Sequence, residues 1–107
     1  MKVLVVDDSI SMANMLVKFL EYKGIRDVDI CYDGYGALEK IRRGNYDAYI
    51  IDYHLPHISG IELAEEASKK GGIIVIITAD KDLRTKKFKV FYKPFKVNDL
   101  CNYILSS

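Results

Sequence analysis

The stretch that decides the fold is Val3-Leu4-Val5-Val6-Asp7-Asp8, an apolar run that ends in two adjacent carboxylates. The chain repeats this arrangement: later apolar runs end at Asp52 and at Thr78, and another is followed by Lys93. Short apolar runs of this kind indicate strands. If the strands lie parallel in one sheet, these side chains meet at its carboxyl edge, where open α/β sheets bind their ligands.

Strand and helix patterns alternate along the whole chain. The expected strands cover about residues 2–6, 28–32, 48–51, 73–78 and 89–92, and the expected helices about residues 9–23, 34–43, 60–70 and 97–105. Ser59 and Glu62 predict a capping box at the third helix, and Gly24 and Gly44 follow the first two helices as stop signals. This alternation predicts an α/β fold in which helices cover both faces of one parallel sheet.

The composition is that of a single globular domain, residues 1–107, with half of its residues hydrophobic and 29% charged. A net charge of +1 gives no overall field that favours nucleic acid or an anionic membrane. Only four apolar residues separate Lys2 from Asp7, too few for a signal-peptide core or a membrane span. Cys31 and Cys101 form no metal or redox motif, which favours buried thiols in a reducing compartment. We expect a cytoplasmic protein.

The three strand-end carboxylates suggest a cation site. Crowded carboxylates repel one another and resist ionisation, and a divalent cation removes that cost. Asp7, Asp8 and Asp52 therefore predict a hard-cation site that includes one reactive aspartate, with the Thr78 hydroxyl and the Lys93 ammonium beside it. For a single aspartate at a strand end, a helix cap is the favoured interpretation, but capping does not account for the threonine and the lysine.

Four motifs in this order, each at the end of its own strand, resemble the receiver domain of two-component response regulators, in its stand-alone chemotaxis-type form. They are Asp7-Asp8, Asp52 with Leu55-Pro56 and Gly60, Thr78-Ala79, and Lys93-Pro94-Phe95. The resemblance covers the whole chain and implies a doubly wound, flavodoxin-like sheet with strand order 2-1-3-4-5. It also implies a sensor histidine kinase or phosphotransfer protein as partner, with an unknown downstream protein target, and leaves a homodimer open.

The resemblance assigns roles to the strand-end residues. Asp52 would be the phosphoacceptor that attacks the phosphorus of a phosphohistidine. Mg²⁺ would be held by Asp7, Asp8 and Asp52 with the backbone carbonyl of His54, whose side chain we interpret as a loop residue rather than a metal ligand.

Two further roles follow from the same resemblance. Lys93, with the metal, would neutralise charge on the transferring phosphoryl group. Thr78 would hydrogen-bond the attached phosphoryl group, and Ala79 would leave room for it. A cis Lys93-Pro94 peptide bond is also implied, which an X-Pro amide permits.

The chain departs from the family pattern in two places, both on the usual output face. Only residues 80–88 separate Ala79 from Lys89, too few for a helix of about 11 residues with its loops. We therefore predict that the fourth helix is absent or reduced to one turn, and that this segment is mobile. The aromatic residue that the family commonly places three positions before the lysine is Val90 here.

Three functions are compatible with these residues. The leading hypothesis is a phosphoacceptor switch, without turnover of an external substrate. The second is a receiver-like docking module without phosphorylation-dependent switching. The third is an aspartyl-phosphate hydrolase, which would need a second aspartate where this chain has His54. Residues 80–89 carry five basic and two acidic side chains, either as an ordinary solvated face or as a phosphorylation-sensitive surface for an acidic partner.

Overall fold

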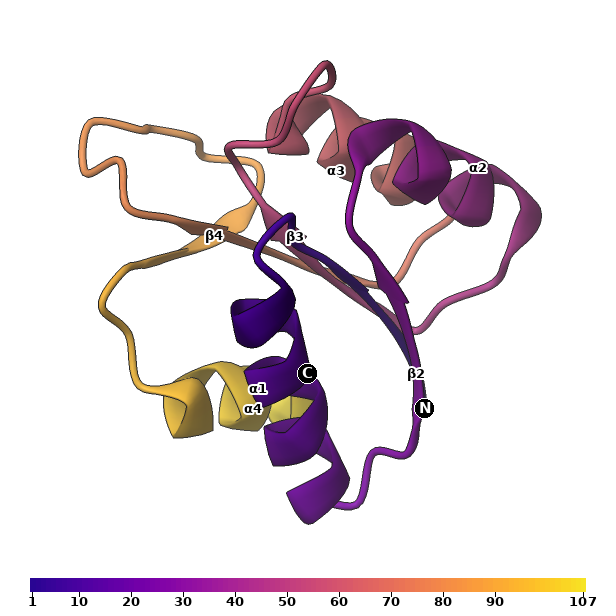
Figure 1. Cartoon of the computed structure of the whole chain (residues 1–107), viewed down its shortest axis with the longest axis vertical. Helices are drawn as coiled ribbons and strands as arrows, with labels where there is room; N and C mark the ends of the chain where they lie inside the picture. Colours follow the sequence, from indigo (N-terminus) through magenta and orange to yellow (C-terminus); the bar gives the residue numbers. More distant parts are fainter.

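Five parallel strands form one sheet with helices on both faces, and the computed structural model describes all 107 residues (Figure 1). The strands are β1 (Lys2–Val6), β2 (Asp27–Cys31), β3 (Ala48–Asp52), β4 (Ile73–Thr78) and β5 (Lys89–Tyr92). The helices are α1 (Ile10–Tyr22), α2 (Gly34–Arg43), α3 (Gly60–Ser68) and α4 (Val97–Ser106). The order β2-β1-β3-β4-β5 confirms the predicted doubly wound sheet.

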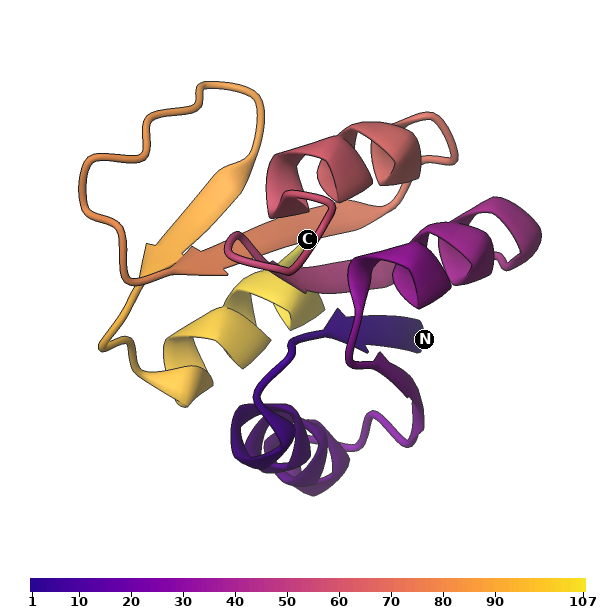
Figure 2. The ribbon, with the colours of Figure 1, turned by 45° about the horizontal axis from the view of Figure 1, so that its top comes forward.

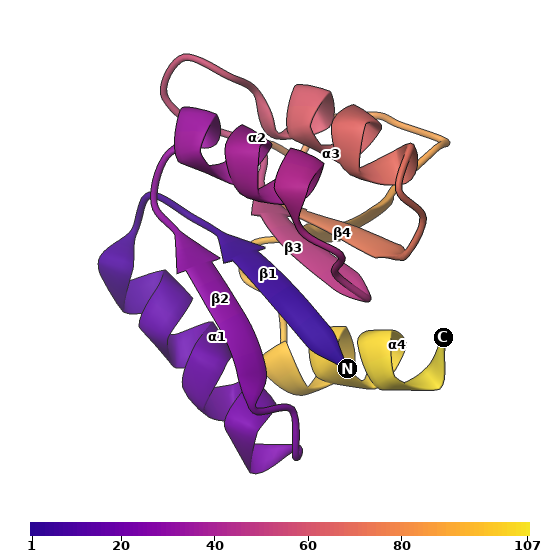
Figure 3. The same cartoon turned by 90° about the vertical axis from the view of Figure 1, so that its right-hand side faces the viewer.

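Helices α2 and α3 cover one face of the sheet, and α1 and α4 cover the other (Figure 3). Because successive strand residues point to opposite faces, the sheet separates two hydrophobic cores. Leu4 and Val6 of β1 pack toward α2 and α3, whereas Val3 and Val5 pack toward α1 and α4. The central strand β3 is buried at every position. This two-sided burial fixes the strand register, since a slip of one residue would exchange the two cores.

Local capping sets the helix boundaries close to those predicted. Ser9, and not Asp8, caps α1 by accepting a hydrogen bond from the Met12 amide. At α3 only half of the predicted capping box forms: the Glu62 amide donates to the Ser59 hydroxyl, but the Glu62 carboxylate does not return a bond. Helix α3 ends at Ser68, before the predicted residue 70, and strand β2 lies one residue earlier than predicted.

The segment between β4 and β5 contains no helix, which confirms the predicted loss of the fourth helix (Figure 2). Phe88, at its end, is buried to 9% exposure in the core beneath α2 and α3. Leu83 and Val90 pack against the same core. Phe88 and Leu83 therefore contribute apolar side chains to this core from the segment that replaces the missing helix. No helix has the length and apolar character needed to span a membrane.

Candidate functional site

The sheet register brings the strand-end residues to one edge. Backbone hydrogen bonds continue the parallel ladders beyond the strands: the Tyr53 amide donates to Ile77 over 2.9 Å, and the Lys93 amide donates to Thr78 over 2.7 Å. The Asp7 amide likewise donates to Cys31 over 3.1 Å. The residues at and just beyond the strand ends are therefore held by sheet hydrogen bonding as well as by their loops.

All three predicted carboxylates meet at this edge. Asp7, Asp8 and Asp52 each offer an oxygen atom, and the three atoms lie within 4.8 Å of one another. Asp7 is fully buried and Asp52 is 5% exposed, whereas Asp8 faces solvent. Two buried carboxylates and one exposed carboxylate thus form a site that solvent reaches from one side.

Burial makes this cluster reluctant to carry its full negative charge. The pKa of Asp52 is raised to about 6, first because the carboxyl is buried and then because Asp7 lies close by. The Lys93 ammonium and the His54 amide act in the opposite direction. Burial also raises the pKa of Asp7, against a lowering by the Ser9 amide and by Lys93.

One oxygen of Asp7 shows that the cluster suits a cation. Oδ1 accepts a hydrogen bond of 2.9 Å from the Ser9 amide, but Oδ2 is buried without any hydrogen-bond partner. Buried polar atoms are normally paired, and an unpaired carboxylate oxygen beside two further carboxylates is the donor set that hard divalent cations prefer. The residues present therefore fit the Mg²⁺ expected from the sequence.

Thr78 and Lys93 lie where the sequence places them, on the neighbouring strand ends. The Thr78 side chain is fully buried, and its Oγ1 accepts a hydrogen bond of 2.9 Å from the Asp80 amide. That bond leaves the hydroxyl proton available for donation. The half-buried Lys93 is close enough to lower the pKa of both buried carboxyls, and its bond to Pro94 is cis, as expected.

Gly60 has a role at the site that sequence reasoning did not supply, although the residue was part of the motif. A Cβ at this position would overlap the Asp52 carbonyl oxygen and lie 2.7 Å from the Cα of Tyr53. The Gly60 amide donates to the Tyr53 carbonyl over 2.9 Å. The loop after β3 therefore folds back tightly over Asp52, and His54 lies within this loop.

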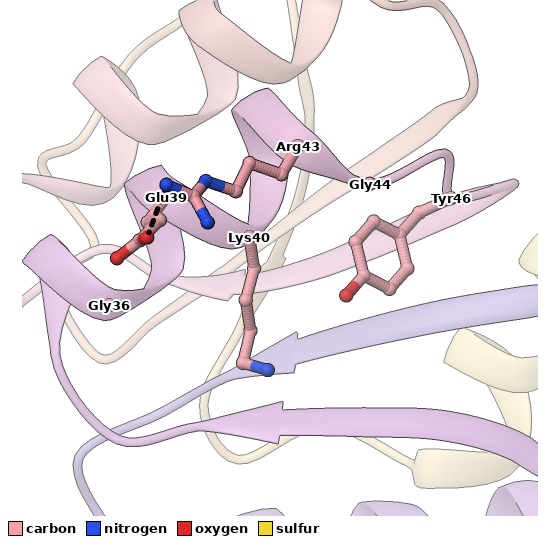
Figure 4. Close-up of a pocket in the computed structure, with 6 residues that line it drawn as sticks. All are labelled: Gly36, Glu39, Lys40, Arg43, Gly44 and Tyr46. Atoms are coloured by element: carbon pink, nitrogen blue, oxygen red, sulfur yellow. Dashed lines mark ion pairs between the residues drawn. The ribbon is translucent and has the colours of Figure 1, made fainter.

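A separate surface pocket lies along α2 and shares no residue with the carboxylate cluster (Figure 4). It measures about 410 Å³ and is lined by Gly36, Glu39, Lys40, Arg43, Gly44 and Tyr46. Within it, Arg43 is paired with Glu39 over 3.3 Å. This pocket contains none of the predicted site residues.

Comparison with known proteins agrees with this geometry. The model of the response regulator receiver domain matches residues 3–105. The chain belongs to this family. This receiver domain is 35% identical over 107 residues to the response regulator ArlR of Staphylococcus saprophyticus, and 32% identical over 107 residues to that of Staphylococcus aureus. Each alignment covers 92% of this chain and 48% of the relative, so the chain spans about half the length of these relatives.

Solved receiver structures have the same fold. The Francisella response regulator 1452 receiver domain superimposes with a TM-score of 0.87 at 28% identity, covering 98% of this chain and 93% of that one. The response regulator TrrA of Thermotoga maritima, in complex with Mg²⁺-BeF, gives a TM-score of 0.86 at 32% identity and covers 99% and 98% of the two chains. Both comparisons extend over nearly the whole receiver domain.

Proposed function

We propose that residues 1–107 act in the cytoplasm as a phosphoacceptor switch, with Asp52 as the acceptor and Mg²⁺ as the cofactor. The observation that carries this proposal is the buried Asp52 carboxylate within 4.8 Å of the Asp7 and Asp8 carboxylates. The unpaired Oδ2 of Asp7 supports the cation. The TrrA relative, whose structure contains Mg²⁺-BeF, supports the same assignment.

In this proposal, an oxygen of Asp52 attacks the phosphorus of a phosphohistidine on a sensor kinase or a phosphotransfer protein. The new P–O bond forms as the P–N bond breaks, and the imidazole leaves with the electron pair of that bond and takes up a proton. The Lys93 ammonium offsets negative charge on the phosphoryl oxygens. The Thr78 hydroxyl donates to one of these oxygens after transfer.

Asp7, Asp8 and Asp52, with the backbone carbonyl of His54, would hold the cation. Bound Mg²⁺ supplies positive charge that lets the carboxylates ionise together and that polarises the phosphoryl group. Phosphorylation then shifts an equilibrium between two conformations, and a downstream protein binds one of them better.

Intact-mass measurement after incubation with acetyl phosphate and Mg²⁺ tests this function. We expect one phosphoryl adduct on the wild-type protein and none on Asp52→Asn. Asp82→Asn is the matched control, because it removes an exposed carboxylate that takes part in no ion pair of the structure. An adduct of unchanged yield on Asp52→Asn would refute the assignment of the acceptor.

A further inference from the structure

The loop between β3 and α3 carries the backbone carbonyl that the proposed function assigns to the cation. This loop, residues 53–59, lies beside the N-terminal end of α2 (Figure 3). The contact is close: a Cβ on Gly34, the first residue of α2, would lie 2.9 Å from Ile58 Cβ and 3.5 Å from the Pro56 carbonyl oxygen. Ile58 itself is buried in the core beneath α2 and α3. The second half of the loop is therefore packed directly against α2.

An exposed pair of rings adds to this packing from the solvent side. The ring of Tyr35, the second residue of α2, stacks on the ring of His57, with the ring centroids 5.6 Å apart and an angle of 19° between the planes. Tyr35 is 61% exposed, and His57 is exposed as well. Neither ring fills the core, so the stack serves to hold the loop against α2.

The backbone of His57 depends on such a contact. Its φ angle is +72°, and it is the one residue other than glycine with a positive φ. Side chains rarely adopt this conformation, and those that do are held in it by their surroundings. The Ile58 amide donates to the Pro56 carbonyl over 2.8 Å, so the chain turns sharply at His57. The stacked Tyr35 ring fixes the side chain of the residue on which this turn depends.

The same loop is fixed at its other end beside the proposed phosphoacceptor. The Gly60 amide donates to the Tyr53 carbonyl over 2.9 Å, and a Cβ on Gly60 would overlap the Asp52 carbonyl oxygen. The His54 ring lies edge-on to the Tyr53 ring, with the centroids 4.7 Å apart. His54 thus lies in the short stretch between Tyr53 and the turn at His57. A change of conformation at His57 would therefore redirect the His54 carbonyl.

We infer that Tyr35 is a positioning residue for the cation: by stacking on His57, it holds the loop so that the His54 carbonyl faces the carboxylate cluster. The inference rests on the proposed function, which assigns the cation to this cluster and this carbonyl. Mg²⁺ requires nearly ideal octahedral geometry, whereas Ca²⁺ accepts irregular coordination. Releasing the loop should therefore weaken the binding of Mg²⁺ more than the binding of Ca²⁺.

Titration with MgCl₂ and, separately, with CaCl₂ tests this inference, with the NMR chemical shifts of the backbone amides as the signal. In Tyr35→Leu, we expect the dissociation constant for Mg²⁺ to rise about fivefold, the factor that one aromatic pair contributes. The dissociation constant for Ca²⁺ should rise by less than about twofold, because Ca²⁺ tolerates a displaced ligand. Tyr35→Phe keeps the ring and should bind both ions like the wild type.

Tyr32→Leu is the matched control for the loss of an exposed tyrosine. Tyr32 is 42% exposed, lies just before α2 and takes part in none of the ring pairs of the structure. This variant should keep both dissociation constants. In urea unfolding, Tyr35→Leu should shift the midpoint no more than Tyr32→Leu does. A larger shift, together with equal losses of affinity for the two ions, would limit Tyr35 to a role in stability and overturn the inference.

A second substitution tests whether Tyr35 acts through His57. Glycine adopts a positive φ readily and has no ring, so His57→Gly removes the stack but permits the turn. His57→Gly alone should show the same selective loss of Mg²⁺ affinity, which keeps the test independent of how well Tyr35→Leu folds. In the His57→Gly background, Tyr35→Leu should raise neither dissociation constant further. A further loss of the same size would mean that Tyr35 does not act through His57.

The outcomes separate this inference from the proposed function. If the amides around Asp52 do not respond to Mg²⁺ even in the wild-type protein, the assignment of the cation fails, and the proposed function fails with it. If the wild type responds but Tyr35→Leu binds Mg²⁺ equally well, or loses affinity for Mg²⁺ and Ca²⁺ by the same factor, this inference alone fails.

Discussion

The carboxyl edge of the sheet and residues 79–88 are neighbours in space but are held by different forces. At the edge, the buried residues Asp7, Asp52 and Thr78 lie at the ends of strands whose register is fixed by two cores. Residues 79–88 have no regular secondary structure and are held by a few side-chain contacts, chiefly the hydrogen bond from the Tyr92 hydroxyl to the Leu83 carbonyl and the buried Phe88.

This difference separates a rigid region, the carboxyl edge, from a region that can change conformation, residues 79–88. The edge has little freedom to change, since moving one residue there disturbs the packing of a central strand. The segment can change at the cost of one or two hydrogen bonds, each of about 1 kcal/mol. Substitutions at the edge should therefore change both the free energy of unfolding and the phosphorylation of Asp52. Substitutions in the segment should change the free energy of unfolding but leave phosphorylation of Asp52 intact.

The largest expected effect is that of Gly60→Ala, which tests how rigid the edge is. The added methyl group would overlap the Asp52 carbonyl, and overpacking of backbone by side chain should lower the free energy of unfolding by about 3 kcal/mol. Phosphorylation by acetyl phosphate should fall with it. Gly71→Ala is the control: φ is +82°, but nothing lies near the position, so a loss of only about 1 kcal/mol is expected. Equal losses in urea unfolding would contradict a rigid edge.

Phe88→Ala tests whether the segment is anchored at its far end. Removing a buried phenylalanine should cost about 3 kcal/mol, while the phosphoryl adduct on Asp52 should still form in the folded protein. Lys86→Ala, an exposed neighbour, should change stability by less than about 0.5 kcal/mol. A loss below about 1 kcal/mol for Phe88→Ala would mean that the segment is not held by the core.

The pH dependence of the free energy of unfolding should reveal the raised pKa of Asp52. Without metal, the pKa of Asp52 is raised to about 6 in the folded protein, against about 3.9 when unfolded. The folded state therefore keeps its proton while the unfolded state loses it, so stability should fall as the pH rises from 4 to 6, by up to about 3 kcal/mol.

Urea unfolding in EDTA measures this dependence. Other carboxylates titrate in the same range, so the decisive quantity is the difference between the wild type and Asp52→Asn, which has no proton to lose at that position. If both proteins show the same slope between pH 4 and 6, burial does not raise the pKa of Asp52.

The smallest expected effect is that of Asp8→Ala, because Asp8 is exposed. Its charge opposes ionisation of both Asp7 and Asp52. The free energy of unfolding of the metal-free variant should therefore exceed that of the wild type by about 0.5 kcal/mol. Added Mg²⁺ should stabilise the wild type by mass action and the variant much less. An undiminished Mg²⁺ response in thermal melts of Asp8→Ala would remove Asp8 from the cation site.

The two regions also differ in how far the sequence predicts them. The edge follows from the local rule that each apolar run ends in a polar residue, and parallel pairing then brings Asp7, Asp52 and Thr78 together. The absence of the fourth helix follows from the short spacing between Ala79 and Lys89. The contact between Tyr92 and Leu83 does not, because it depends on how an irregular loop folds back. The predicted mobility of this segment stays a prediction.

The unpaired Oδ2 of Asp7 was likewise beyond sequence reasoning. A sequence shows that carboxylates gather at the edge, but not which oxygen the Ser9 amide occupies and which stays free. The same holds for Gly60, where the path of the loop over Asp52 leaves no room for a side chain. In both cases the feature depends on atomic positions, which the spacing of residues along the sequence does not determine.

The irregular segment has a consequence for protein engineering. The turn at residues 80–83 and the anchor at Phe88 are separate structures, and the bond between Arg84 and Thr85 lies between them. Doubling the length of a flexible loop costs only about 0.6 kcal/mol in closure entropy. A foreign peptide inserted after Arg84 should therefore be displayed between β4 and β5 while both strands keep their places, so this loop is suited to carrying grafted binding sequences.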